Sequence, residues 1–133
     1  MADILRKAKV AIIEDEINLV KVIKEYLEMR GYGVVEAYDG RSGLEVVRTE
    51  MPDVVILDIG LPDIDGSDVL AELKKDEGTK AIPVIVLTAK QEQFDRNLLL
   101  KLGAYEFISK PYRAHILQRQ IDNVLEKRAR GEL

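Results

Sequence analysis

The chain has 133 residues, a length that favours one domain with a sizeable core over a two-domain enzyme. It contains no cysteine, which excludes disulfide scaffolds, thiol catalysis and thiolate metal sites. Its 20 Lys and Arg against 24 Asp and Glu give a net charge of -4, which provides no general attraction to nucleic acid or to an anionic membrane.

Five short apolar runs predict the strands of a sheet, at residues 10–13, 34–35, 54–57, 84–87 and 107–108. The third and fourth runs are continuous and rich in β-branched residues, as is typical of strands covered on both faces. No run approaches the about 20 residues needed to cross a bilayer, and residues 1–9 lack the apolar core of a secretory signal. We therefore expect a cytoplasmic protein with no membrane partner.

Stretches with helical spacing follow each run and predict five helices. The apolar positions that mark them are Ile17, Val20, Ile23 or Lys24, and Leu27; Leu44 and Val47; Val69 and Leu73; Phe94, Leu98 and Leu102; and Leu117, Ile121, Val124 and Leu125. Strands that alternate with helices predict a doubly wound α/β fold with a parallel sheet and helices on both faces. We expect one domain over residues 1–133, with its core at about 7–127 and a frayed tail or linker stub at 128–133.

Reactive side chains follow four of the five runs. They are Glu14-Asp15-Glu16 after the first, Asp58 after the third, Thr88 after the fourth and Ser109-Lys110 after the fifth. Taken singly, each has a structural explanation: acids at a helix start, a turn residue, a helix cap and a solvated charge. Ligands of an open parallel sheet bind at the carboxyl ends of the strands, so the joint placement favours one shared site. Without cysteine, and with His115 as the single histidine, oxygen ligands remain, and these suit a hard cation such as Mg²⁺.

Four motifs in order make the chain similar to a known family. They are IIEDE at 12–16, VILDIGLPDIDG at 55–66, VLTA at 86–89 and GAYEFISKP at 103–111. Over about residues 7–127 the chain resembles the receiver domain of two-component response regulators. The resemblance implies the flavodoxin-like strand order 2-1-3-4-5, which places the run at 34–35, the one without a reactive end, at the edge of the sheet.

The resemblance also implies a phosphorylation site. Asp58 would accept a phosphoryl group from the phosphohistidine of a sensor kinase or phosphotransfer protein, in a reaction that the domain itself catalyses and slowly reverses by hydrolysis, without being a conventional turnover enzyme. Mg²⁺, with Mn²⁺ able to substitute, would be held by Glu14, Asp15, Asp58 and the main-chain carbonyl of Gly60; whether Glu14 binds directly or through water stays open. Lys110 and Thr88 would bind phosphoryl oxygens, Phe107 would be the switch aromatic, and the bond before Pro111 would be cis.

In the family, phosphorylation changes the packing of one face, which here comprises the helix with Leu98 and Leu102, the strand at 107–108 and the last helix. Only some of four leucines within residues 98–102 can point inward. We therefore predict a surface patch with Leu99 or Leu100 that binds a downstream protein or a second copy of the chain.

Three other functions fit parts of the sequence. The first is a receiver-shaped interaction module that works without phosphorylation, which the presence of Asp15, Asp58, Thr88 and Lys110 disfavours. The second is a flavodoxin-like ligand binder, but acids stand where a phosphate-binding loop would have glycines. The third is a haloacid-dehalogenase-type phosphatase, which would need a second acid at the position of Gly60.

Overall fold

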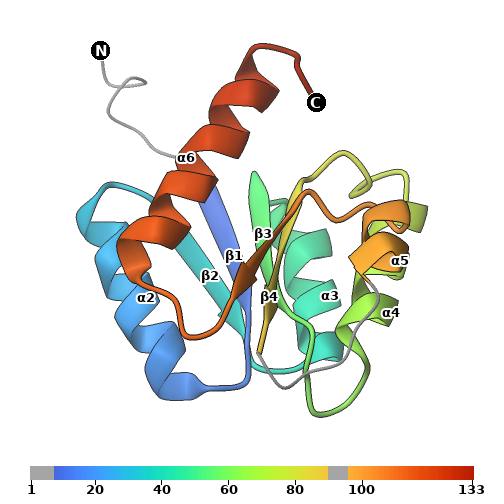
Figure 1. Cartoon of the computed structure of the whole chain (residues 1–133), viewed down its shortest axis with the longest axis horizontal. Coiled ribbons are helices and arrows are strands. Elements are labelled where there is room, and N and C mark those ends of the chain that lie inside the picture. Colours follow the sequence, from blue (N-terminus) through green and yellow to red (C-terminus); the bar gives the residue numbers. More distant parts are fainter. Residues whose placement is uncertain (1–7, 90–95) are drawn as a thin grey trace.

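The computed structural model describes residues 8–89 and 96–133, and within them five parallel strands form one sheet. The strands are β1 (Lys9–Ile13), β2 (Gly33–Ala37), β3 (Val54–Asp58), β4 (Val84–Thr88) and β5 (Glu106–Ser109). Their order is β2-β1-β3-β4-β5, which confirms the expected flavodoxin-like α/β fold and places β2 at the edge. The carboxyl ends of β1 and β3 point to the lower edge of the view in Figure 1.

Helices cover both faces of the sheet. Their bounds are α2 (Ile17–Met29), α3 (Gly40–Glu50), α4 (Gly66–Lys75), α5 (Arg96–Lys101) and α6 (Ala114–Ala129). Helices α2 and α6 lie on one face, and α3, α4 and α5 lie on the other (Figure 1). No helix among the residues that the structure describes is long and apolar enough to cross a membrane.

Alternate side chains of each strand enter two apolar cores. In β1, Val10 and Ile12 pack on the side of α2 and α6, whereas Ala11 and Ile13 pack on the side of α3 and α4. Every residue of β3 and β4 is buried, as the continuous apolar runs predict. The two central strands are therefore closely packed on both faces. Their backbone holds the polar residues at the strand ends in fixed positions.

The inward faces of two helices differ from the prediction. Val20, Ile23 and Leu27 of α2 are buried as expected, but Ile17, the first residue of the helix, is exposed. In α5, Leu99 is buried, whereas Leu98 and Leu100 are 49% and 46% exposed; Phe94, expected on the same stripe, lies outside the described residues.

The prediction that Leu99 contributes to a surface patch is therefore wrong. Leu99 packs into the core shared by α3, α4 and α5, and Leu98, expected to point inward, is on the surface instead. One residue along a helix rotates the side chain by about 100°, so a shift of one position exchanges the buried and exposed leucines. Leu100 keeps its predicted place on the surface.

Helix α6 extends through Ala129, beyond the point at which the sequence predicts a frayed end. Arg128 Nη1 donates to the carbonyl oxygen of Asp53 over 2.8 Å, and Arg130 Nη1 lies 2.8 Å from Glu126 Oε1. These polar contacts stabilise the last turn of the helix. The spacing of apolar residues alone does not predict them.

Candidate functional site

The predicted site residues come together at the carboxyl ends of β1, β3, β4 and β5. Glu14 directly follows β1, Asp58 ends β3, Thr88 ends β4 and Lys110 directly follows β5. The backbone N–H of Lys110 donates to the carbonyl oxygen of Thr88 over 2.6 Å, which fixes the end of β5 beside β4. Residues that lie far apart in the sequence thus become neighbours through the strand order alone.

Three carboxylates form an acidic cluster at this edge. One oxygen each from Glu14, Asp15 and Asp58 lies within 4.8 Å of the others. Glu14 and Asp58 are buried and Asp15 is exposed, so the cluster has a buried base and one side that solvent can reach. This set of hard oxygen donors matches the ligands that Mg²⁺ prefers.

Lys110 is shared among the acids. Its Nζ lies 2.7 Å from Glu14 Oε1, 3.2 Å from Asp58 Oδ2 and 3.6 Å from Glu16 Oε1. Asp58 Oδ1 accepts a hydrogen bond from the backbone N–H of Gly60 over 3.1 Å, and Glu14 Oε2 accepts one from Glu16 over 3.1 Å. Both oxygens of Asp58 therefore have donors that fix the carboxylate plane.

One ammonium does not balance this charge. Burial is the main cause that raises the pKa of Glu14 to about 7, and the charge of Asp58 adds to the effect although Lys110 opposes it. Burial alone would lower the pKa of Lys110, but Glu14 and Asp58 outweigh it and hold that pKa above its ordinary value. With Glu14, Asp15 and Asp58 ionised against Lys110, the site has an excess negative charge that a divalent cation would neutralise.

We predict that the metal-free protein loses stability as the pH rises from about 4.5 to about 7, the pKa values of Glu14 in the unfolded and folded states. The folded protein keeps a proton on Glu14 that the unfolded chain releases, so this contribution is complete below pH 4.5 and is lost through pH 7. Relative to Glu14→Gln, the decline should reach roughly 3 kcal/mol. Urea unfolding of both proteins in EDTA across this range measures it, and equal declines would contradict the assignment.

The remaining predicted residues lie around the cluster. The side chain of Thr88 is buried at the end of β4. Phe107 in β5 is half-buried, packs against the core on the α5 side and has the guanidinium of Arg96 4.8 Å from its ring centre. Gly60 is exposed, and a role for its carbonyl in metal binding stays a prediction. The bond between Lys110 and Pro111 is cis, the isomer that the resemblance implies.

Three further residues at this edge were not among the predicted site residues. Glu16 is the third acid near Lys110, and its place in the acidic triplet was the available signal. The hydroxyl of Tyr112 is buried near the acids, and no local pattern indicates this. Asp63 accepts hydrogen bonds from the backbone N–H groups of Gly40 and Arg41 over 2.7 and 3.0 Å, so it helps to cap the first turn of α3 although it lies in the loop before α4.

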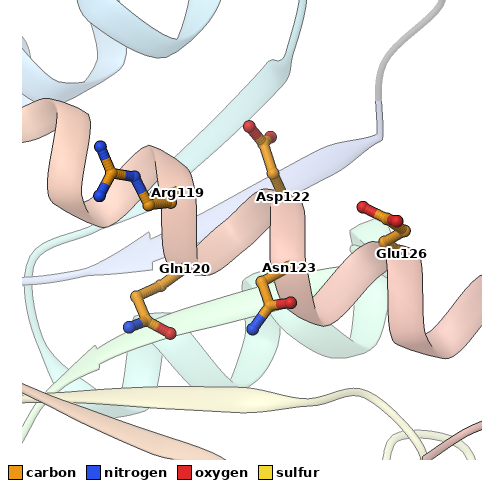
Figure 2. Close-up of a pocket in the computed structure, with 5 residues that line it drawn as sticks. All are labelled: Arg119, Gln120, Asp122, Asn123 and Glu126. Carbon is orange, nitrogen blue, oxygen red and sulfur yellow. The ribbon is translucent and has the colours of Figure 1, made fainter.

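A polar hollow of about 390 Å³ lies elsewhere, along the outer face of α6. The side chains that line it are Arg119, Gln120, Asp122, Asn123 and Glu126, all from this one helix (Figure 2). It contains none of the predicted site residues, and an open groove along one helix gives a ligand few convergent contacts. The acidic cluster is therefore the stronger candidate site.

The model of the response regulator receiver domain matches residues 10–122. The chain belongs to this family. Among curated proteins, this receiver domain is 42% identical over 125 residues to the probable transcriptional regulator ycf27 of Guillardia theta, with 94% of this chain and 48% of that protein covered. It is 34% identical over 119 residues to the alkaline phosphatase synthesis transcriptional regulatory protein PhoP of Bacillus subtilis, with 90% and 49% covered. The chain thus spans about half the length of these curated relatives.

Solved structures place the receiver domain in the same family. A CheY-like response regulator receiver domain protein of Methanospirillum hungatei superposes with a TM-score of 0.86 at 25% identity, with 92% of this chain and 97% of that chain covered. The receiver domain of the sensor histidine kinase PA1611 of Pseudomonas aeruginosa superposes with a TM-score of 0.80 at 28% identity, with 90% and 98% covered. That structure has a magnesium ion coordinated in its active-site cleft.

Proposed function

We propose that this receiver domain accepts a phosphoryl group on Asp58 in two-component signalling. The observation that carries the proposal is the position of Asp58: a buried carboxylate, 3.2 Å from Lys110 Nζ and clustered with Glu14 and Asp15. A carboxylate is a weak nucleophile toward an anionic phosphoryl group. Charge neutralisation and in-line positioning therefore have to supply the catalysis.

The donor we propose is a phosphohistidine on a sensor kinase or phosphotransfer protein. A carboxylate oxygen of Asp58 forms a bond to phosphorus while the bond between phosphorus and the histidine nitrogen breaks. The leaving nitrogen keeps the electron pair and takes up a proton, and Asp58 becomes an acyl phosphate. Hydrolysis of this bond would then return the free carboxylate.

Glu14, Asp15, Asp58 and the carbonyl of Gly60 would hold Mg²⁺, and the cluster of hard oxygens supports this assignment. When bound, the ion would neutralise the carboxylates and a phosphoryl oxygen. Lys110 would move from its carboxylate partners toward the phosphoryl group, a step that suits a compact ammonium on a flexible stem. The Thr88 hydroxyl would donate to a second phosphoryl oxygen.

The output we propose is a shift between two packings of the face formed by α5, β5 and α6. Movement of Thr88 toward the phosphoryl group would make room for Phe107 to turn inward. Phe107 lies two strand residues before Ser109, the register partner of Thr88, so it is well placed to respond. Leu100 on α5 would then contact a downstream protein or a second copy of the chain.

Acetyl phosphate with Mg²⁺ tests the proposal, because it supplies the phosphoryl group without a kinase. We expect intact-mass analysis to find one base-labile phosphoryl adduct on the parent and none on Asp58→Asn or in EDTA. Asp65→Asn is the matched control, since Asp65 is an exposed acid on the same loop without a side-chain capping bond, and it should label like the parent. Equal labelling of Asp58→Asn would overturn the assignment, and a folded parent without adduct would favour a phosphorylation-independent interaction module.

A further inference from the structure

Two half-buried cations line a hollow at the edge of the sheet opposite the acidic cluster. Lys74 lies in the last turn of α4 and Arg128 in the last turn of α6. The hollow has a volume of about 390 Å³, and Pro83, Gly103 and Tyr105, which lie just before β4 and β5, also line it. We call it the amino-edge hollow, because it lies where these strands begin, towards the upper edge of Figure 1.

Lys74 is held at this hollow by contacts with the backbone. Its Nζ donates to the carbonyl oxygens of Ile82 and Lys80 over 2.6 and 3.1 Å. Its stem lies against Gly103, where an added Cβ would be 2.8 Å from Lys74 Cγ. An ammonium has three donors, so one remains for a ligand after these two hydrogen bonds.

Arg128 reaches the same edge from the other face of the sheet. Its Nη1 donates to the carbonyl oxygen of Asp53 over 2.8 Å, and a guanidinium has further donors for a ligand. Asp53 precedes β3 and Ile82 precedes β4, and these strands are neighbours with Val55 opposite Val84. Adjacent strands lie about 4.8 Å apart, so the two carbonyls that anchor Lys74 and Arg128 bring the cations together.

No carboxylate in the described part of the chain lies within ion-pair distance of either cation. The acids nearby in the sequence have other partners: Glu72 pairs with Arg48 and Lys75, Asp76 with Arg48, and Glu77 with Lys80, and the Asp53 carboxylate accepts from the backbone N–H of Lys9. Burial lowers the pKa of Lys74, and the charge of Arg128 lowers it further. The amino-edge hollow therefore has an excess of positive charge that an anion would neutralise.

A phosphate monoester matches this charge and shape. It has nearly two negative charges at pH 7, one for each cation, whereas a single carboxylate would leave one cation uncompensated. Its oxygens can accept from a guanidinium and an ammonium together. Pro83 and Tyr105 offer an apolar and an aromatic surface to an organic group, and the volume of about 390 Å³ suits a small ligand. The net charge of -4 disfavours a nucleic acid or an anionic membrane as the partner.

We propose that the amino-edge hollow binds a small organic phosphate, with its phosphate group between Lys74 and Arg128 and its organic group against Pro83 and Tyr105. The hollow lies at the opposite end of the strands from Asp58, so this binding does not depend on the proposed phosphorylation. A ligand held by α4 and α6 connects the two faces of the sheet and stabilises the folded protein.

Titration with phenyl phosphate in metal-free buffer tests the proposal, with backbone amide NMR signals as the readout. Without a metal, the acidic cluster repels the anion. We expect the largest shifts at Gly103, Ala104 and Tyr105, and a dissociation constant about tenfold lower than that of inorganic phosphate, because the organic group buries apolar surface. Acetate at equal ionic strength should leave these signals nearly unchanged. Equal shifts with acetate, or the largest shifts at the acidic cluster, would overturn the proposal.

Arg128→Gln and Lys74→Met should each weaken the binding of phenyl phosphate about tenfold or more. Arg130→Gln and Lys75→Met are the matched controls, because each lies on the same helix as its counterpart and already pairs with a surface acid; they should change the affinity less than about twofold. If Lys74→Met fails to fold because two carbonyls lose their donor, Arg128→Gln decides alone. Equal effects of Arg128→Gln and Arg130→Gln contradict the assignment.

A short DNA duplex provides the last arm of the test. We expect it to bind more weakly than phenyl phosphate at the same phosphate concentration, because the chain has a net negative charge. Tighter binding of the duplex that depends on Arg128 would assign the amino-edge hollow to nucleic acid and overturn the proposal of a small ligand.

Discussion

Lys110→Met is expected to lower the free energy of unfolding by about 3 to 5 kcal/mol at pH 8 in EDTA. The substitution keeps a long apolar stem but removes the ammonium that lies 2.7 Å from Glu14 and 3.2 Å from Asp58. Both carboxylates are buried, so they lose their shared cation while they remain out of contact with bulk water. Removal of one partner from a buried ion pair costs more than the pair itself contributes, because the remaining charge is uncompensated.

The loss should be smaller at pH 6 than at pH 8. The pKa of Glu14 is already about 7 with Lys110 in place, and without the ammonium it should rise further, so protonation relieves the repulsion at the lower pH. Urea unfolding at both pH values measures the difference. Lys80→Met is the matched control, because Lys80 pairs with Glu77 at 2.9 Å on an exposed surface, where such pairs contribute about 0 to 1 kcal/mol. Equal losses at Lys110 and Lys80 would show that the site lysine is not supporting buried charge.

Gly66→Ala is expected to destabilise the fold by about 1 to 3 kcal/mol and to slow phosphorylation of Asp58, the proposed acceptor. A Cβ at Gly66 would lie 2.5 Å from the Cα of Ile59 and 2.8 Å from the carbonyl oxygen of Asp58. These are backbone atoms, which cannot turn away as a flexible side chain can. The start of α4 and the end of β3 would have to separate, and that movement would displace the carboxylate of Asp58.

Gly33→Ala provides the control for this substitution. A Cβ at Gly33 meets nothing within 4 Å, and the residue lies on the edge strand β2, so stability should change by less than about 0.5 kcal/mol. Thermal unfolding and the initial rate of adduct formation with acetyl phosphate are the two measurements. Labelling of Gly66→Ala at the parent's rate would contradict this prediction. It would mean that the start of α4 and the end of β3 separate without displacing the carboxylate of Asp58.

The convergence of Asp58, Thr88 and Lys110 was predictable because it depends on strand order and on the side chains that end each strand. Apolar runs locate the strands, and parallel pairing brings their ends to one edge. The register of α5 was not predictable, since adjacent leucines satisfy helical spacing equally well and only packing against the sheet selects Leu99. Its first expected residue, Phe94, lies outside the described part of the chain and adds no constraint.

The environments of Asp63 and Tyr112 could also not be predicted from the sequence. Asp63 precedes α4 but caps α3, a choice that depends on how the loop after β3 folds back over the sheet. The Tyr112 hydroxyl is buried without a hydrogen-bond partner among the residues that the structure describes, and a periodic sequence pattern cannot indicate such an environment. Long-range polar contacts of this kind depend on the finished packing and have no local signature.

The hydrogen bonds from Asp63 to α3 have a mechanical consequence for the segment that follows Asp58, the proposed phosphoacceptor. Residues 59–62 connect a strand end in the centre of the sheet to a carboxylate anchored on the first turn of a neighbouring helix. Because both ends of this segment are anchored, its middle can shift locally but the segment cannot move as a whole. Displacement of Asp58 would therefore pull on the amino terminus of α3, and strain from the proposed phosphorylation would reach the side of the molecule remote from β5.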